Sequence, residues 1–187
     1  MKLYDRKLLM GLKPEDIDIK EIAHNLSQIC RYAGATPGFY SVAEHSVIVA
    51  EMMYDNVNLI ENNSNVLAAM YGLLHDAHEA YIGDIIYPVK YIIKSEMLNT
   101  LINNIDIAIL IKESLYLDFY IFSWLVEKFD KQLGSIECNK FFNTNQWKSS
   151  VTPEYREILL KKIAMLQPRD AEQQFLSMYN ALKTIRS

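Results

Sequence analysis

The sequence is poor in the residues that break helices and in the residues that cross-link chains. It has 6 glycines and 5 prolines in 187 residues, about half their usual combined frequency of roughly 12%. Turn-rich all-β folds need more of both residues, so the composition favours a helical protein. Its two cysteines, Cys30 and Cys138, lie far apart and in no CxxC motif, which predicts neither a disulfide framework nor a cysteine zinc site. A reducing cytoplasm is the compartment that fits best.

Long hydrophobic runs and an excess of positive charge are also missing. The longest apolar stretch, around residues 66–74, falls far below the ~18 residues that span a bilayer, and the N-terminus lacks the apolar stretch of a signal peptide. The formal charge is −4, from 19 Lys and Arg against 23 Asp and Glu, whereas a nucleic-acid-binding protein normally has a basic surface. We therefore expect neither a membrane nor a polymeric nucleic acid as partner. A local basic pocket for one small anion remains compatible with this charge.

The length fits a single domain over residues 1–187. The first 14 residues predict a short non-helical arm, and residues 81–90 predict a loop. Ser41, followed by Glu44 three residues later, matches the capping box that begins a helix. Apolar periodicity and these signals predict an all-α bundle of about seven helices, at approximately 16–32, 42–54, 64–80, 94–113, 116–138, 153–165 and 169–184.

Histidine is scarce as well, so each one is informative. Three of the four, His45, His75 and His78, fall in or beside predicted apolar helices. At about 100° per residue, His75, Asp76 and Glu79 lie on one side of their predicted helix. An imidazole with two carboxylates suits a divalent first-row metal, although an HD dipeptide also arises as a core histidine beside an acidic helix end. No second histidine follows His78 at the HExxH spacing, which excludes a zinc-protease motif.

Four residues at intervals along the chain resemble the H…HD…D signature of the HD-domain metal-dependent phosphohydrolases. They are His45 in SVAEHS, His75 and Asp76 in LLHDAHEAYIGD, and Asp130 in KFDKQLGSIE. The segments AHNLSQICRYAG, YPVKY and PRDAEQQFLSMYNAL are similar to a small subgroup that contains bacterial 5′-deoxynucleotidases and phage deoxynucleoside triphosphohydrolases. The resemblance runs from about residue 16 to about residue 184, and it implies an HD-domain helical bundle.

The resemblance implies that His45, His75, Asp76 and Asp130 bind a catalytic divalent metal. Co, Mn, Zn and Fe are candidates for this site, and Mg is a candidate for the substrate phosphates. Taken alone, His45 is read more readily as a core histidine, and a surface acid is the minor alternative for Asp130. Asp118 is a competing acidic residue, but the DKxLxxxE context favours Asp130.

The resemblance also implies roles for residues around the metal. Glu79 and Asp84 match the acidic positions of HDxxExxxxD, so we expect them to orient the attacking water, to move its proton or to contact the sugar. Arg31 and Lys90 match cations that contact the phosphates, and Tyr32 is placed to stack on a nucleobase. Without the resemblance, these residues are read as helix-end acids, surface cations and a core aromatic.

Hydrolysis of a deoxynucleotide by a metal-activated water is the implied activity. Release of triphosphate from a dNTP, with dATP as one substrate, is the first expectation, and release of orthophosphate from a dNMP is the alternative. A non-catalytic metal-binding module and a plain helical scaffold are alternatives of other classes. The subgroup further implies a homo-oligomer, dimer or hexamer, and the host cytoplasm if the protein is phage-encoded. His78 is expected on the helix exterior or as a hydrogen-bonding neighbour of the ligands, and Lys131 on the surface or at a distal phosphate.

Overall fold

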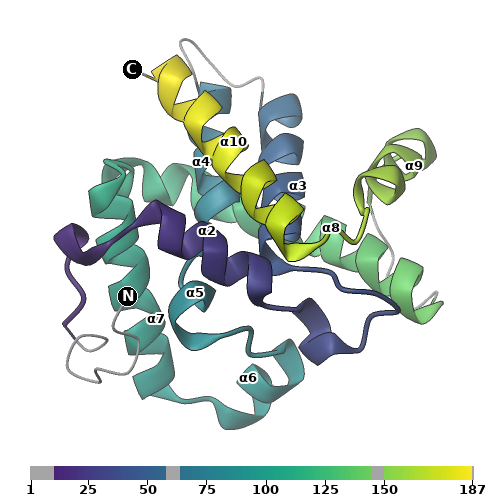
Figure 1. Cartoon of the computed structure of the whole chain (residues 1–187), viewed down its shortest axis with the longest axis horizontal. Helices are drawn as coiled ribbons and strands as arrows, with labels where there is room; N and C mark the ends of the chain where they lie inside the picture. The colour runs from purple at the N-terminus through teal and green to yellow at the C-terminus, as the bar shows by residue number, and fades with distance from the viewer. Residues whose placement is uncertain (1–10, 58–63, 145–149, 187) are drawn as a thin grey trace.

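All regular secondary structure in the described part of the chain is helical. The structure, a computed structural model, describes residues 11–57, 64–144 and 150–186, without the side chains of residues 118 and 119 (Figure 1). The predicted all-α class is confirmed. The predicted N-terminal arm lies largely outside these ranges. None of the helices within them has both the length and the apolar character that crossing a membrane requires.

Each of the seven predicted helices corresponds to a helix of the structure. They are α2 (Ile19–Gln28), α3 (Val42–Asn56), α4 (Ser64–Leu74), α7 (Glu96–Lys112), α8 (Phe119–Phe142), α9 (Pro153–Lys162) and α10 (Pro168–Arg186). Short 3₁₀ turns η1 (Pro14–Asp16), η2 (Arg31–Gly34) and η3 (Tyr116–Asp118) lie between some of them. The helix expected over residues 16–32 is shorter than predicted, because the chain is extended at residues 29–30 before η2.

Two further boundaries differ from the prediction. The helix expected over residues 64–80 ends at residue 74; turns follow at residues 75–78, and then the short helix α5 (Glu79–Ile82). The expected loop at residues 81–90 contains the start of α6 (Tyr87–Ile93). None of the residues of α6 is buried. With seven residues and Pro88 in its first turn, α6 is too short for the apolar spacing to predict a helix.

The core lies where α3, α4 and α8 pack together, and α10 crosses α2, α3 and α4 (Figure 1). Every residue from Val42 to Ala50 is buried, so α3 is surrounded on all sides. Gly72 of α4 allows the close approach of α3, since a Cβ there would lie 2.9 Å from the sulfur of Met53 and 3.0 Å from Cα of Ala50. This close packing brings the histidine of α3 and the histidine after α4 to the same place.

The capping box predicted at the start of α3 is half correct. The hydroxyl of Ser41 accepts the backbone N–H of Glu44 at 3.1 Å, which confirms the helix cap. The carboxylate of Glu44, however, points across the fold. It accepts three backbone N–H groups of the chain between α9 and α10, those of Ala164, Met165 and Leu166, at 2.7, 2.9 and 2.8 Å. Glu44 therefore ties α3 to this connection.

Candidate metal centre

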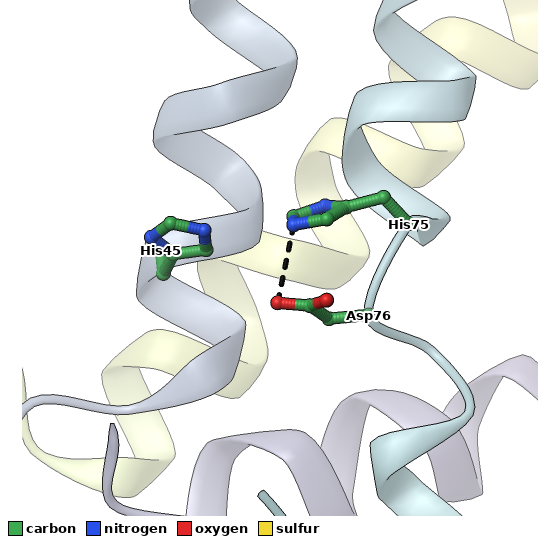
Figure 2. A group of neighbouring side chains, drawn as sticks. All are labelled: His45, His75 and Asp76. Carbon is green, nitrogen blue, oxygen red and sulfur yellow. Dashed lines mark ion pairs between the residues drawn. The ribbon is translucent and has the colours of Figure 1, made fainter. Parts of the chain in front are cut away.

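The residues predicted as metal ligands converge from three parts of the chain. His45 of α3 faces His75 and Asp76, which follow the end of α4, and one donor atom from each lies within 4.8 Å of the others (Figure 2). Asp130 of α8 completes the group: its Oδ1 is 3.1 Å from Nε2 of His45 and 4.0 Å from Nε2 of His75. The structure thus brings together two imidazoles and two carboxylates.

Both imidazoles are held through Nδ1. The Nδ1 of His75 lies 2.7 Å from the carbonyl oxygen of Gly72. Because a carbonyl only accepts, Nδ1 carries a proton, so in the neutral ring that would bind a metal the lone pair lies on Nε2. The Nδ1 of His45 lies 2.6 Å from a carboxylate oxygen of Glu137. Anchoring of the distal ring nitrogen by a carbonyl or a carboxylate is the usual arrangement of metal-binding histidines.

The surroundings of one buried ring nitrogen test whether a metal fits these two imidazoles and two carboxylates. The Nε2 of His75 is buried and makes no hydrogen bond within the described residues, although it lies 3.1 Å from Oδ2 of Asp76. The ion pair with Asp76 engages Nε2 when the ring is protonated, and a bound metal would satisfy the nitrogen and the carboxylate together. Imidazole nitrogens mixed with carboxylate oxygens suit Mn, Fe, Co or Zn. The residues present therefore fit a divalent first-row metal.

The local electrostatics favour a cation at the same point. Burial lowers the pKa of His75, but the charges of Asp76 and Asp130 outweigh it and raise this pKa to about 9. Burial would raise the pKa of Asp76, yet His75 and Arg31 hold it well below its ordinary value. The carboxylates are therefore ionised at neutral pH, and the negative potential that protonates His75 would also attract a divalent ion.

The sequence analysis missed Glu137, a residue at the centre of the site. Its Oε1 accepts from Nδ1 of His45 and from the hydroxyl of Tyr40, both at 2.6 Å, and its Oε2 accepts from the hydroxyl of Tyr32 at 2.6 Å. Burial would raise the pKa of Glu137, but the charges of His45 and Arg31 and these hydrogen bonds lower it. The signal was present: Glu137 is the final residue of the DKxLxxxE pattern, two helical turns after Asp130 on α8.

Arg31 lies at the centre itself. Its guanidinium contacts Oδ2 of Asp76 at 3.3 Å and Oε2 of Glu137 at 3.5 Å, and its side chain is only 14% exposed. The Nε of Arg31 is buried and has no hydrogen-bond partner among the described residues. The alternative of a surface cation is therefore wrong for Arg31, and phosphate binding stays a prediction.

Tyr32 is held by the same buried network. Its hydroxyl donates to Glu137, and its ring meets the rings of Phe141 and Phe142 edge-on, with centroids 6.2 and 5.4 Å away. Its φ of 57° lies in the left-handed region that residues other than glycine seldom adopt. These contacts describe an aromatic anchored beside Arg31, and its stacking on a nucleobase stays a prediction.

The predicted catalytic acids lie in α5 and in the chain that follows it, close enough to Asp76 for its charge to act on Glu79. Glu79 is buried, and its Oε1 is 3.5 Å from Nζ of Lys90, whose side chain is 36% exposed. Asp84 follows Gly83, whose φ of 81° ends α5. Burial, together with the charges of Asp76 and Asp84, raises the pKa of Glu79 to about 7. A carboxylate with such a pKa exchanges protons readily near neutral pH.

The structure also shows the surroundings of His78 and Lys131, for which the sequence suggests no single role. His78 is buried, and its Nδ1 lies 3.1 Å from Oδ1 of Asp106 on α7, which corrects the alternative of the helix exterior and agrees with a hydrogen bonder near the ligands. Lys131 forms an exposed pair with Glu127, at 2.5 Å on α8, in agreement with the surface alternative.

A cavity of about 280 Å³ opens beside the centre, between α4, α7 and α8. His75 and Asp130 form part of its wall, and most of the remaining wall is apolar, including Leu74, Ile109 and Val126. Its volume is close to the lower end of the range for small-molecule sites. The candidate metal centre is therefore accessible from a pocket with room for an organic group.

Comparison with known proteins gives relatives without an assigned activity. No protein-family model matches the chain. An uncharacterised protein of Rhodobacter capsulatus is 45% identical over 84 residues, which are 44% of this chain and 41% of that protein. The uncharacterised protein YfdR of Escherichia coli K12 is 39% identical over 79 residues, 42% of this chain and 38% of YfdR. The matched regions therefore span about two fifths of the length of these curated relatives.

Proposed function

We propose that the protein is a metal-dependent phosphohydrolase of the HD-domain type that acts on deoxynucleotides. The observation that carries this proposal is the convergence of His45, His75, Asp76 and Asp130, with the guanidinium of Arg31 3.3 Å from Asp76. The resemblance in the signature segments supports the substrate class. Deoxynucleoside triphosphates, dATP among them, are the first candidates, and deoxynucleoside monophosphates are the second.

The metal would be held by the two imidazole Nε2 atoms and by the carboxylates of Asp76 and Asp130. A divalent ion bound there supplies Lewis-acid chemistry, which activates water as a nucleophile and polarises a phosphoryl oxygen. Gly72 and Glu137 fix the two rings through Nδ1, so the ligand atoms are aligned before any ion arrives. Such preorganisation raises metal affinity because little ordering remains to be done on binding.

The cations beside the ligands supply the sites for the phosphates. Arg31 uses its terminal nitrogens for long contacts to Asp76 and Glu137, and a guanidinium has five donors in a planar fork. It can therefore hold a phosphate oxygen while it remains next to Glu137. Lys90 is half-exposed at 3.5 Å from Glu79, so a phosphate can attract its ammonium group. Glu79, with its pKa of about 7, is the proposed acceptor of the proton that the attacking water loses.

A substrate panel tests this function. The protein is incubated with dNTPs, NTPs and dNMPs in the presence of Co²⁺, Mn²⁺ or Mg²⁺, and the inorganic product is identified. Release of triphosphate from a dNTP is the expected result. Orthophosphate from dNMPs would establish the second candidate instead. A protein that binds the metal but hydrolyses none of these nucleotides would contradict the enzymatic proposal and favour a non-catalytic metal-binding module.

Asp76→Ala tests the metal assignment within that activity. Removal of a carboxylate central to the site is expected to abolish turnover and to weaken metal binding, while the helical circular dichroism signal stays unchanged. Asp55→Ala is the matched control, because Asp55 is exposed on α3 and its loss should leave turnover at the wild-type level. Wild-type turnover by Asp76→Ala would refute the assignment.

A further inference from the structure

Large apolar side chains gather on one exposed face, at the end of α7, in η3 and at the start of α8. Leu117 is 90% exposed, Tyr120 85% and Trp124 56%. We call the exposed apolar residues of this region, which η3 connects by contacts to both helices, the α7–α8 patch: Ile107, Ile111, Tyr116, Leu117, Tyr120, Ile121 and Trp124. Single surface hydrophobics are ordinary, but a contiguous group of this kind is typical of an interaction surface.

The start of α8 has two apolar faces. Phe122, Leu125 and Phe129 are buried in the core. At about 100° per residue, Tyr120 and Trp124 lie on the opposite side of the helix, where they are exposed. A helix that is apolar on all sides is normally covered on all sides. The described part of the chain does not cover the outer face of α8, so we infer that another molecule does.

The patch lies next to the cavity beside the candidate metal centre. Leu110 of α7 and Ser123 of α8 both line this cavity, so the two helices run along it. On each helix the next residue, Ile111 or Trp124, belongs to the patch. About 100° of rotation therefore separates the cavity wall from the patch on both helices. A molecule that covered the patch would lie beside this cavity.

The area of the patch is close to one half of a stable interface. An aromatic side chain carries about 150–250 Å², so the three aromatic and four aliphatic residues present on the order of 700 Å² at their exposed fractions. The largest apolar patch of an ordinary monomer measures about 300–600 Å². A standard interface buries about 800 Å² on each partner. Two such patches in contact would therefore supply most of the area that a stable dimer needs.

The charges around the patch suit a second copy of the same chain. Their signs are mixed, since three exposed lysines and two acids lie next to the patch: Lys112, Lys128, Lys131, Asp106 and Glu127. Identical surroundings meet when two copies pair, so a rim of one sign would repel itself, whereas a mixed rim can pair opposite charges. Tyr and Trp, which the patch contains, are also enriched at the centres of protein interfaces.

We propose that two copies of this chain pair through the α7–α8 patch, with a two-fold axis near Tyr120 and Ile121 of both α8 helices. Residues at equal distances on either side of the axis then meet, so Trp124 of one copy contacts Leu117 of the other. Two-fold symmetry lets each copy cover the patch of the other, which produces a closed dimer. The pairing involves neither metal nor nucleotide, so it stands independently of the proposed hydrolase.

Sedimentation velocity of the full chain at micromolar concentration tests the pairing. A species of twice the chain mass of 21.7 kDa is expected. Ile121→Glu should raise the dissociation constant of the dimer about 100-fold or more, because symmetry buries two carboxylates without partners. Ile158→Glu is the matched control, since Ile158 is exposed on α9 outside the patch, and its dimer should persist. A monomeric wild type, an intact Ile121→Glu dimer, or equal dissociation of the two variants overturns the proposal.

Cross-linking near the axis tests the pairing without a charged substitution. Ile121→Cys keeps a small apolar side chain at this position, and two copies of a residue near a two-fold axis face each other. A short bis-maleimide should therefore join two Ile121→Cys chains. It should join Ile158→Cys chains no more than wild-type chains, whose Cys30 and Cys138 are half-buried. Cross-linking of Ile121→Cys at the wild-type level, or equal cross-linking of the two variants, overturns the proposal.

Discussion

Two buried glutamates, Glu44 of α3 and Glu137 of α8, receive different kinds of donors. Glu44 accepts backbone N–H groups at residues 164–166 in the connection between α9 and α10. Within the described residues, the donors to Glu137 are side chains: the imidazole of His45, two tyrosine hydroxyls and the guanidinium of Arg31. Both carboxylates are almost completely withdrawn from water, with exposed fractions of 1% and 0%.

The kind of donor separates a structural role from a positioning role. Backbone N–H groups need a partner whatever the protein does, so Glu44 satisfies a connection that would otherwise be buried without one. The donors of Glu137 are themselves groups of the candidate metal centre. Their orientation, and so the direction of the ligand atom of His45, depends on this carboxylate. Burial and residue type alone would not distinguish the two glutamates.

Glu137→Gln is expected to have the largest effect on the metal centre. The amide keeps one acceptor oxygen but presents an NH₂ group to donors, so it cannot serve His45, Tyr32 and Arg31 together. It also removes the negative charge beside Arg31, whose guanidinium would then compete more strongly with the metal for Asp76. Affinity for Co²⁺ should fall about 10–100-fold. A binding isotherm followed by the visible absorption of bound Co²⁺ measures this change.

Glu44→Gln is the matched control for that experiment. Both variants replace a buried glutamate by its amide, and only Glu137 contacts a proposed ligand. Unchanged Co²⁺ affinity in Glu137→Gln, or an equal loss in the two variants, would contradict a positioning role for Glu137.

Glu44→Gln should itself lower the free energy of unfolding. One of three backbone N–H groups at residues 164–166 would face the amide NH₂, and a buried donor without a partner costs about 1–2 kcal/mol. Urea unfolding of the metal-free protein, followed by circular dichroism, measures this loss. An unchanged midpoint would show that water or another acceptor replaces the carboxylate at this connection.

The helices and the four proposed ligands were accessible from the sequence because their signals are local or spaced along the chain. Apolar periodicity marks α3 and α4, and His45, His75, Asp76 and Asp130 match a spaced signature. The helix α6 was missed because it has only seven residues, contains Pro88 in its first turn and follows the turn residue Gly83 closely. A periodicity argument needs a longer window than this helix provides.

The role of Glu137 could not be predicted because its partners lie far away in the sequence. It is 92 residues from His45, 97 from Tyr40 and 105 from Tyr32. Glu44 accepts backbone N–H groups, and Glu137 accepts from side chains of the metal centre. This difference depends on how α3 and α8 pack together. That packing includes the close approach allowed by Gly72, for which the sequence shows only a small residue in an apolar helix.

The smallest effect on metal affinity is expected from the loss of a single hydroxyl group. This loss tests whether the hydrogen bonds to Glu137 act on the metal centre or only on the stability of the fold. Tyr40 donates to Glu137 at 2.6 Å, and Tyr179 donates to a different buried glutamate, Glu113, at 2.9 Å. Tyr40→Phe removes one of the hydrogen bonds that fix Glu137 and should weaken Co²⁺ affinity about two- to fivefold, since such a bond contributes about 0.5–1 kcal/mol. Tyr179→Phe should destabilise the fold comparably and leave Co²⁺ affinity unchanged. If both variants lowered metal affinity equally, the effect would come from general loosening of the bundle, and Glu137 would have no special connection to the metal centre.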